Sequence, residues 1–371
     1  MKKKYFIIAG ESSGDEHGSL LMKEMSHLDQ HISFEGIGGK KMIAQGLSSL
    51  YSIEKMAVMG FVEVLKNYSF FKSVEKEVLS NIDNKKYHGI ILIDYPGFNL
   101  RVAKKIKIKY PQLPVYYYIS PQIWAWKEDR IKIIKKYVDK MIVIFDFEKT
   151  WYKNRGVNAS FVGHPFIDLY DSINKEEIFS KLNFSKENKY LTLFPGSRKQ
   201  EINYHLPIML EALKDNFFKS FKVVLGVAPE IQKDLFSTYD LKNVQIVDTN
   251  PEDVLAIADF AWVGSGTSTL QAVLFNTPFV LVYKTSFLSW LLMKNLIKVP
   301  YAGIPNIIYD NKLIPELLQK NFNPINLINE TKRFFNNSSY RQSLFSGYKI
   351  IQSRLGKSGA SKRAAKIILG M

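Results

Sequence analysis

Several short segments carry residues suited to polar chemistry, and each follows a run of β-branched or aromatic residues. The first, residues 10–15 (Gly-Glu-Ser-Ser-Gly-Asp), joins the apolar run 5–9 to an amphipathic helical pattern. Glycine lets the backbone approach a ligand, and the amides of a helix start favour anionic or hydroxyl-rich groups. Alone this turn is a weak signal, because it lacks GxGxxG spacing and similar turns are common in parallel α/β proteins.

Two further segments lie in the N-terminal half. Asp94 follows the apolar run 89–93 and precedes Pro96, so its carboxylate is either a base at a strand end or a turn former. Residues 120–126 (Ser-Pro-Gln-Ile-Trp-Ala-Trp) follow the run 115–119. Trp124 and Trp126 predict an apolar wall for a sugar or acyl group, with domain-packing anchors as the alternative.

The C-terminal half carries two segments suited to phosphate. Residues 195–198 (Pro-Gly-Ser-Arg) place Arg198 after a strand, where its guanidinium can fork onto a diphosphate. Residues 264–269 (Gly-Ser-Gly-Thr-Ser-Thr) predict a second phosphate-binding turn. No lysine stands at the P-loop position, which disfavours a Walker-type NTPase. No Asp-x-Asp pair occurs in the sequence, so we expect Arg198 and helix dipoles, not a metal ion, to stabilise the diphosphate.

The alternation of short apolar runs with helical patterns predicts an α/β fold of two Rossmann-like, parallel-sheet domains. The runs are residues 5–9, 32–37, 89–93, 115–119, 141–145 and 160–162, then 190–194, 221–225, 244–247, 260–263 and 279–283. A polar stretch, 168–188, separates the two sets. We expect domains at 1–168 and 169–345, facing a central cleft, and C-terminal helices at 346–371 that pack back on the first domain.

The composition also limits which classes of function are possible. The 371 residues, 46% of them hydrophobic, suffice for two cores, and the absence of cysteine excludes disulfides and cysteine chemistry. Neither a signal peptide nor a membrane-spanning stretch is predicted. The net charge of +16 indicates an anionic partner, either nucleic acid, anionic lipid or a phosphorylated substrate, unless it is a lysine-rich solvated surface.

These segments, together with residues 57–65 and 305–308, resemble the lipid-A-disaccharide synthase family in order and over nearly the whole chain. The resemblance implies a glycosyltransferase of the GT-B fold, without a cofactor, in lipopolysaccharide synthesis of Gram-negative bacteria. Such an enzyme transfers 2,3-diacylglucosamine from its UDP derivative to 2,3-diacylglucosamine 1-phosphate. The α-linked donor and β-linked product imply inversion, which needs one base.

The resemblance also assigns site residues. Asp94 is the expected base, and Glu11 is the alternative. The residues expected to bind the UDP-sugar are Ser197, Arg198, Gly264, Ser265, Gly266, Thr267, Gln271 and Asn306. Those expected to form the acceptor and acyl wall are Ser12, Ser13, Ser120, Gln122, Trp124 and Trp126. The chain departs from the family at Gly97, where a second Asp is usual, and at Gln271, where a Glu is usual.

Because both substrates are diacylated, the resemblance implies a cytoplasmic enzyme bound peripherally to the anionic, cytoplasmic face of the inner membrane. The expected membrane contacts are Met59, Phe61, Val62, Leu65, Phe70 and Phe71. Residues 286–299, with Trp290, Leu291, Lys294 and Lys298, are a second candidate. Both segments are alternatively ordinary core helices. A homodimer is compatible with the sequence.

Two other functions stay open at this stage. Another UDP-sugar enzyme of the same architecture, such as a 2-epimerase or a muramyl-intermediate transferase, would share the diphosphate site but would not need the tryptophan wall. A basic nucleic-acid-binding protein is suggested by charge alone, and the sequence lacks RRM, KH and helix-turn-helix signatures. We therefore expect no nucleic-acid partner.

Overall fold

The chain forms two compact units. The computed structural model describes residues 3–51, 53–56, 68–170, 173–228, 231–287, 289–291 and 298–371. The first unit comprises Met1–Leu169 and Leu355–Met371, and the second comprises Tyr170–Arg354. The break after Leu169 lies one residue from the boundary expected at 168, whereas the C-terminal segment of the first unit begins at Leu355 and not at residue 346.

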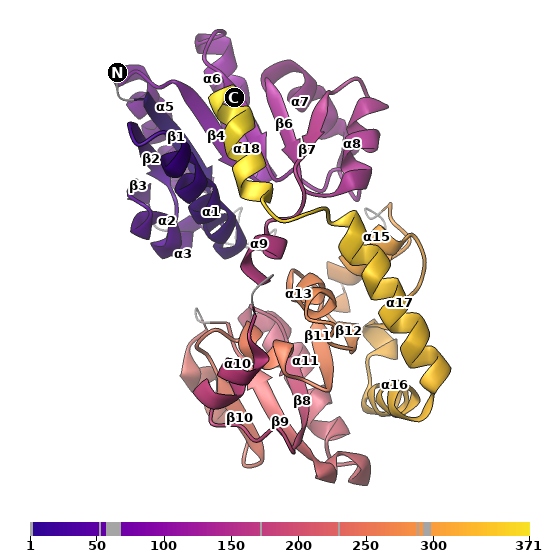
Figure 1. Cartoon of the computed structure of the whole chain (residues 1–371). Coiled ribbons are helices and arrows are strands. Elements are labelled where there is room, and N and C mark those ends of the chain that lie inside the picture. Colours follow the sequence, from indigo (N-terminus) through magenta and orange to yellow (C-terminus); the bar gives the residue numbers. More distant parts are fainter. Residues whose placement is uncertain are drawn as a thin grey trace. The chain divides into compact units, whose positions relative to one another are not determined.

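Seven parallel strands form the sheet of the first unit, in the order β3-β2-β1-β4-β5-β6-β7 (Figure 1). They are β1 (Lys3–Ala9), β2 (Ile32–Ile37), β3 (Leu47–Tyr51), β4 (Gly89–Ile93), β5 (Val115–Tyr118), β6 (Lys140–Val143) and β7 (Ala159–Phe161). The strand order reverses between β1 and β4. In open sheets of this kind, ligands bind outside the carboxyl ends of the strands at this reversal.

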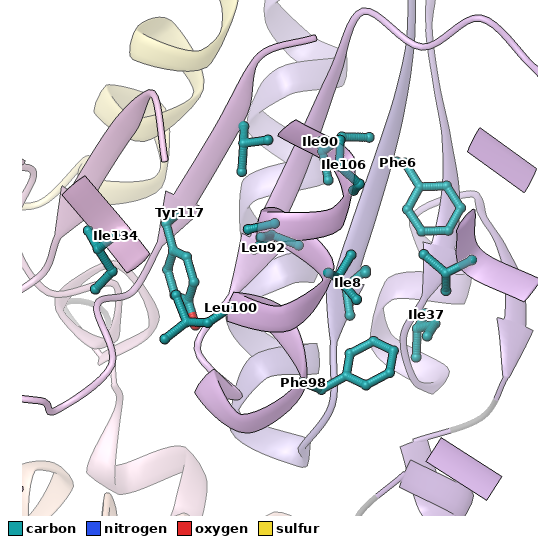
Figure 2. Close-up of a cluster of buried hydrophobic side chains, with 14 of the residues drawn as sticks. Phe6, Ile8, Ile37, Ile90, Leu92, Phe98, Leu100, Ile106, Tyr117 and Ile134 are labelled. Atoms are coloured by element: carbon teal, nitrogen blue, oxygen red, sulfur yellow. The ribbon is translucent and has the colours of Figure 1, made fainter. Parts of the chain in front are cut away.

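The core of the first unit is built by alternate residues of the central strands. Figure 2 shows Ile8 of β1 with Ile90 and Leu92 of β4, all fully buried, beside Leu100 and Ile106 of α6 (Pro96–Lys109). Burying one such side chain contributes about 1.5–3 kcal/mol to stability. The helices therefore pack on a continuous apolar sheet face, which fixes where the loops at the strand ends emerge.

Of the other helices described in this unit, all but α9 (Phe166–Tyr170) and the final helix connect successive strands of the sheet; α9 follows the last strand and ends at the boundary of the unit. The connecting helices are α1 (Ser12–Leu28), α2 (Lys40–Ala44), α3 (Ile53–Met56), α5 (Tyr68–Asn84), the 3-10 turn η1 (Glu128–Arg130), α7 (Ile131–Tyr137) and α8 (Asp146–Lys153). The final helix, α18 (Ala360–Leu369), returns to this unit and packs against α1 (Figure 1). Asp168 holds its start, because the carboxylate accepts hydrogen bonds from the amides of Gly359 and Ser361.

The second unit has a six-stranded parallel sheet in the order β10-β9-β8-β11-β12-β13 (Figure 1). The strands are β8 (Lys189–Phe194), β9 (Phe221–Gly226), β10 (Val244–Val247), β11 (Phe260–Gly264), β12 (Phe279–Tyr283) and β13 (Glu316–Leu318). Here the strand order reverses between β8 and β11. The prediction of two Rossmann-like parallel sheets is confirmed.

Helices cover this second sheet as well. They are α10 (Lys175–Lys181), α11 (Lys199–Ala212), η2 (Asn216–Ser220), η3 (Lys233–Thr238), α12 (Glu252–Ala256), α13 (Ser268–Leu274), α15 (Ile304–Tyr309), η4 (Gln319–Asn321), α16 (Pro324–Asn336) and α17 (Ser338–Arg354). Within the part of the chain that the structure describes, no helix has the length and apolarity needed to cross a membrane.

Candidate functional site

Asp94 lies directly after β4, beside the strand-order reversal of the first unit. Its backbone is left-handed, with φ 41°, as is that of Tyr95, with φ 48°. Such backbone costs on the order of 1 kcal/mol for a residue with a side chain. Asn99 of α6 secures it, because its amide nitrogen donates to the carbonyls of Ile93 (3.1 Å) and Asp94 (2.8 Å). The hydroxyl of Tyr117 also donates to the Asp94 carbonyl.

The carboxyl of Asp94 has the electrostatics of a general base. Asp94 retains some accessible surface, but burial of its carboxyl, reinforced by the charge of Glu11, raises its pKa to about 7. The positive charge of Arg130 opposes this rise. A base with a pKa near the working pH combines a populated deprotonated form with useful basicity. The side chain is therefore suited to take a proton from a hydroxyl group.

The loop after β1 adjoins Asp94. A side chain at Gly10 would meet the ring of Tyr95 at 2.5 Å, so glycine is needed where this loop approaches the one after β4. Glu11 precedes α1 and influences Asp94 electrostatically. Asp15, the last residue of the same sequence segment, has another role: its buried carboxylate accepts hydrogen bonds from the amides of Gly39, Lys41 and Met42, at the start of α2.

The wall role expected for Trp124 stays a prediction; in this structure Trp124 is buried. Its side chain is 7% exposed, and its indole nitrogen donates to Glu148 Oε1 (3.0 Å). The other oxygen of Glu148 accepts from the amide of Phe145 (3.2 Å), and burial raises the pKa of this carboxyl to about 7. Trp124 is thus an internal anchor of the loop after β5. Trp126, by contrast, is 38% exposed.

The other residues expected to form the acceptor and acyl wall differ in solvent exposure. Ser12 and Gln122 are exposed, and Ser13 is partly buried. Ser120 is buried, and its hydroxyl shares a hydrogen bond with that of Tyr152 (2.8 Å). Ser120 therefore helps to fix the loop after β5 and does not offer its side chain to a ligand in this conformation.

The predicted membrane segment is only partly described. Met59, Phe61, Val62 and Leu65 lie outside the described residues. Phe71 is 5% exposed and belongs to the hydrophobic core, which agrees with the alternative of an ordinary core helix; its membrane contact stays a prediction. Phe70 is partly buried, and its ring packs edge-on against Tyr51, with 6.0 Å between the centroids.

In the second unit, the turn after β8 presents Arg198. Gly196 has φ 127°, and a side chain there would meet Glu201 Oε2 at 2.4 Å. Glu201, from the first turn of α11, accepts from the amide of Ser197 (3.1 Å) and pairs with Arg198 Nη1 (3.2 Å). Both Ser197 and Arg198 are exposed. Glu201 therefore shapes the turn and pre-orients a guanidinium that remains accessible to an anion.

His205 ties this turn to the neighbouring strand end. Its Nδ1 hydrogen-bonds the carbonyl of Pro195, and its Nε2 accepts from the amide of Lys284 (2.8 Å), directly after β12. Burial lowers the pKa of His205. A neutral imidazole with hydrogen on Nδ1 satisfies both bonds. His205 is thus a structural link between two loops of the site.

The second glycine-rich turn, after β11, lies against the first. A side chain at Gly264 would come within 3.2 Å of the carbonyls of Phe194 and Pro195, so glycine permits this approach. Gly266 has φ 155°, and Thr267 is exposed, while Ser265 donates to the carbonyl of Ala302 (3.3 Å). Gln271 follows on α13 and is partly buried.

Asn306 makes internal hydrogen bonds beside this site. The residue is 1% exposed, and its amide nitrogen donates to Ile314 O and Glu316 Oε1, both at 2.9 Å. Its oxygen accepts from the amides of Leu313 (3.0 Å) and Ile314 (2.9 Å). These four bonds use the hydrogen-bonding capacity of a carboxamide. Direct binding of the UDP-sugar by Asn306 stays a prediction; in this structure the Asn306 side chain is bonded within the protein.

Glu316 extends these hydrogen bonds. Its carboxylate accepts from the amides of Ala302 and Gly303, each at 2.9 Å, as well as from Asn306. The loop that receives the hydroxyl of Ser265 is thereby fixed from β13. Among the described residues, no group of three His, Asp or Glu side chains could hold a metal ion.

Four supporting residues were not identified from the sequence: Glu148, Glu201, His205 and Glu316. Glu201 had a recognisable signal, because it lies three residues after Arg198 at a helix start. The other three act on partners brought near by the fold. Their contacts join Glu148 to the loop after β5, His205 to Lys284, and Glu316 to residues 302–306.

Comparisons with known proteins agree with this arrangement. A sequence profile of the lipid-A-disaccharide synthetase family matches residues 5–368. The lipid-A-disaccharide synthase of Coxiella burnetii (strain CbuG_Q212) is 35% identical over 369 residues, covering 99% of this chain and 98% of its own. Lipid-A-disaccharide synthase 1 of Legionella pneumophila (strain Lens) is 36% identical over 361 residues, covering 95% of this chain and 94% of its own.

Solved structures show the fold. The UDP-GlcNAc 2-epimerase from Neisseria meningitidis, solved with UDP-GlcNAc, has a TM-score of 0.66 at 12% identity and covers 99% of both chains. A calicheamicin glycosyltransferase has a TM-score of 0.61 at 12% identity, covering 100% of this chain and 99% of its own. The fold is that of GT-B glycosyltransferases and related epimerases, and the chain belongs to the lipid-A-disaccharide synthase family of glycosyltransferases.

Proposed function

We propose that the chain transfers 2,3-diacylglucosamine from UDP to 2,3-diacylglucosamine 1-phosphate, with inversion at the anomeric carbon. The acceptor hydroxyl attacks this carbon, the bond to the diphosphate breaks, and UDP leaves with the electron pair. Family membership supports the reaction class, and the site residues of each unit support the assignment of individual roles.

The observation that carries this proposal is Asp94 with its raised pKa at the strand-order reversal of the first unit. In the proposed step, its carboxylate takes the proton from the acceptor hydroxyl. Glu11 keeps the basicity of Asp94 high through its negative charge. The side chain of Asn99 and the hydroxyl of Tyr117 hold the Asp94 backbone, so the carboxyl is positioned in advance of substrate binding.

The second unit is the proposed UDP site. Arg198 is accessible, and the two glycine-rich turns lie side by side, with Ser197, Gly266 and Thr267 exposed. The guanidinium would stabilise the charge that develops on the leaving diphosphate, so that no acid is needed to protonate it. Solved neighbours with UDP-GlcNAc, and with UDP and glucose, support a UDP-sugar donor.

Detection of UDP and disaccharide by mass spectrometry tests the reaction. With the diacylated donor and acceptor together, we expect equal amounts of UDP and disaccharide. With either substrate alone, or with UDP-GlcNAc in place of the donor, we expect turnover to fall at least a hundredfold. Acceptor-independent conversion of UDP-GlcNAc to an epimer would contradict the proposal and support a 2-epimerase.

We further propose that the enzyme acts on the cytoplasmic face of the inner membrane, because both substrates carry acyl chains. Phe287 is 77% exposed and Leu291 is 47% exposed, four residues apart on a helical segment in which the Trp290 amide donates to the Ser286 carbonyl (2.9 Å). Two apolar side chains on one face can insert at a bilayer surface. Nearby Lys298 is exposed.

Flotation with anionic vesicles tests this contact. Phe287→Ser with Leu291→Ser should lower the vesicle-bound fraction about tenfold, because each lost insertion removes at least 1 kcal/mol. The matched control is Ile325→Ser with Ile350→Ser, which removes two apolar side chains that are 69% and 41% exposed elsewhere in the same unit. Equal flotation of both double variants would exclude this helix as a membrane contact.

A further inference from the structure

An exposed aromatic ring with two cations lies in the loop after β5. The Nζ of Lys127 is 4.5 Å from the centroid of the Trp126 ring, and the guanidinium carbon of Arg130 is 5.5 Å from the same centroid. Cation–π attraction holds both charges near the ring. We call Trp126, Lys127 and Arg130 the basic–aromatic cluster.

Among the described basic residues of the first unit, some are paired with carboxylates and others, such as Lys132 and Lys136, are not; the cations of this cluster belong to the second group. Within the described chain, neither Lys127 nor Arg130 forms an ion pair, and the neighbouring Glu128 is already paired with Arg155 (2.7 Å). Basic residues that are paired in the first unit include Lys3, Lys4, Lys41, Lys85, Arg101, Lys105, Lys107 and Lys109.

Holding these two charges together is unfavourable without an anion. Burial lowers the pKa of Lys127, and the charge of Arg130 lowers it further. Lys127 also has left-handed backbone, with φ 54°, at a residue that is not glycine. Strain and like-charge repulsion concentrated in one exposed loop are typical of a ligand site. A bound anion would relieve the repulsion.

The cluster is also coupled to the proposed base. Burial lowers the pKa of Arg130, whereas Tyr117 and Asp94 oppose this shift. Arg130 is therefore close enough to Asp94 for each to influence the ionisation of the other. Asp94 and the loop that carries the cluster emerge from the adjacent strands β4 and β5. An anion bound at the cluster would lie near the hydroxyl that Asp94 deprotonates.

We propose that Trp126, Lys127 and Arg130 bind the phosphate monoester of the acceptor sugar; this inference rests on the proposed function. A phosphate monoester carries between one and two negative charges near neutral pH, which matches two cations better than the single charge of a phosphodiester headgroup. The exposed face of Trp126 can pack against the sugar ring. Because the phosphate and the attacking hydroxyl belong to one hexose, anchoring the phosphate would orient the hydroxyl toward Asp94.

The test compares two acceptors in detergent micelles: 2,3-diacylglucosamine 1-phosphate and the same lipid with a free anomeric hydroxyl. For the wild type, we expect kcat/KM to be at least a hundredfold higher with the phosphorylated acceptor. In Lys127→Gln with Arg130→Gln, this ratio should fall below ten, while KM for the donor changes less than threefold. The ratio cancels any indirect effect of Arg130 on the pKa of Asp94, since both acceptors use the same base.

A matched control removes two charges from the helix that follows. Lys132 and Lys136 of α7 are exposed, so Lys132→Gln with Lys136→Gln should leave the acceptor ratio unchanged. If the Lys127 and Arg130 variant keeps the wild-type ratio, the inference is overturned; an accompanying loss of flotation with phosphatidylglycerol vesicles would then identify the cluster as a headgroup contact. If the wild type releases no UDP with either acceptor, the proposed function itself fails.

Discussion

The loops proposed for catalysis in the first unit and the turns proposed for phosphate binding in the second unit differ in how their backbone is shaped. In the first unit, residues with side chains adopt left-handed backbone: φ is 41° at Asp94, 48° at Tyr95 and 54° at Lys127. In the second unit, glycine occupies the corresponding turns, with φ 127° at Gly196 and 155° at Gly266. A side chain in this region of backbone space costs free energy that glycine does not.

The difference follows from what each loop presents. The loops of the first unit offer charged side chains, and a strained residue keeps its functional group. The turns of the second unit bring two backbone segments close together, for which glycine is suited, and partly buried carboxylates hold them in place. Glu201 and Glu316 accept from backbone amides there, whereas Asp94 is kept at a raised pKa. Backbone strain and a shifted pKa thus occur in the loop proposed for catalysis, and hydrogen-bonded glycine turns occur in the site proposed for UDP binding.

The largest expected effect comes from removing the ionisable group of the first unit. Asp94→Asn preserves size and backbone bonds but cannot accept a proton, so kcat should fall by about 10²–10⁴. Initial rates of UDP release measure this effect. In the wild type, kcat/KM should rise with pH and level off above about 7, as the carboxyl of Asp94 deprotonates.

Glu11→Gln is the comparison variant for this prediction. Without the charge of Glu11, the pKa of Asp94 should fall, so the acidic limb of the pH profile should move to lower pH. Near-normal turnover of Asp94→Asn would exclude Asp94 as the base and make Glu11 the next candidate.

A smaller effect is expected from the accessible cation of the second unit. Arg198→Ala should weaken UDP binding by about 10–100-fold, since a hydrogen bond to a charged group contributes about 1.5–3 kcal/mol. Its ion pair with Glu201 is half-exposed on the arginine side, so stability should change by less than about 1 kcal/mol. Calorimetry with UDP measures the affinity. Arg198→Lys keeps the positive charge but cannot form the two parallel hydrogen bonds of a guanidinium, so it should give an intermediate affinity. Unchanged affinity of Arg198→Ala would show that this turn has only a structural role.

Replacing a glycine with alanine, which adds one methyl group, tests whether the turn at Gly196 requires glycine. Gly196→Ala forces a side chain into left-handed backbone and against Glu201 Oε2, so it should lower the free energy of unfolding by about 1–3 kcal/mol and weaken UDP binding. Gly97→Ala is the control in the first unit, because a side chain there meets no atom within 4 Å. Its stability should stay within about 0.5 kcal/mol, or rise slightly. Urea unfolding compares the two; equal costs would mean that glycine is not required at 196.

Much of the fold was predictable from the sequence, because buried parallel strands have a strong local signal. The runs at 32–37 and 89–93 coincide with β2 and β4. Two strands were missed. Only Leu47 is buried in the edge strand β3, and β13 has three residues, so neither gives a continuous apolar run. The pattern of apolar residues does not indicate a strand that is short or half-exposed.

The sequence indicated which loops carry the candidate site residues, but it did not indicate the contacts of each side chain. Asp94 and Arg198 follow strands, and their position along the chain made them candidates; the role of Asp94 as base came from the family resemblance. Trp124 and Asn306 were assigned to ligands because their sequence contexts gave no sign of Glu148 and Glu316. Each of these contacts joins residues that only the fold brings together. A single sequence carries no signal for such pairs.

The smallest expected effect concerns stability and follows from the same carboxyl as the largest. Burial and Glu11 raise the pKa of Asp94 from 3.8 to about 7, so the folded state binds this proton more tightly than the unfolded state does. Stability therefore falls as pH rises from about 4 to about 7, because folding must then desolvate a charge. Asp94→Asn lacks that charge, so its free energy of unfolding relative to the wild type should increase as the pH rises from about 4 to about 8. Urea unfolding of both proteins across this range measures the difference, with Gly97→Ala as a control that should run parallel to the wild type. If the stability difference between Asp94→Asn and the wild type is the same at every pH, the pKa of Asp94 is not raised in the folded protein. The contrast between the left-handed loops of the first unit and the glycine turns of the second unit would then lose its main support.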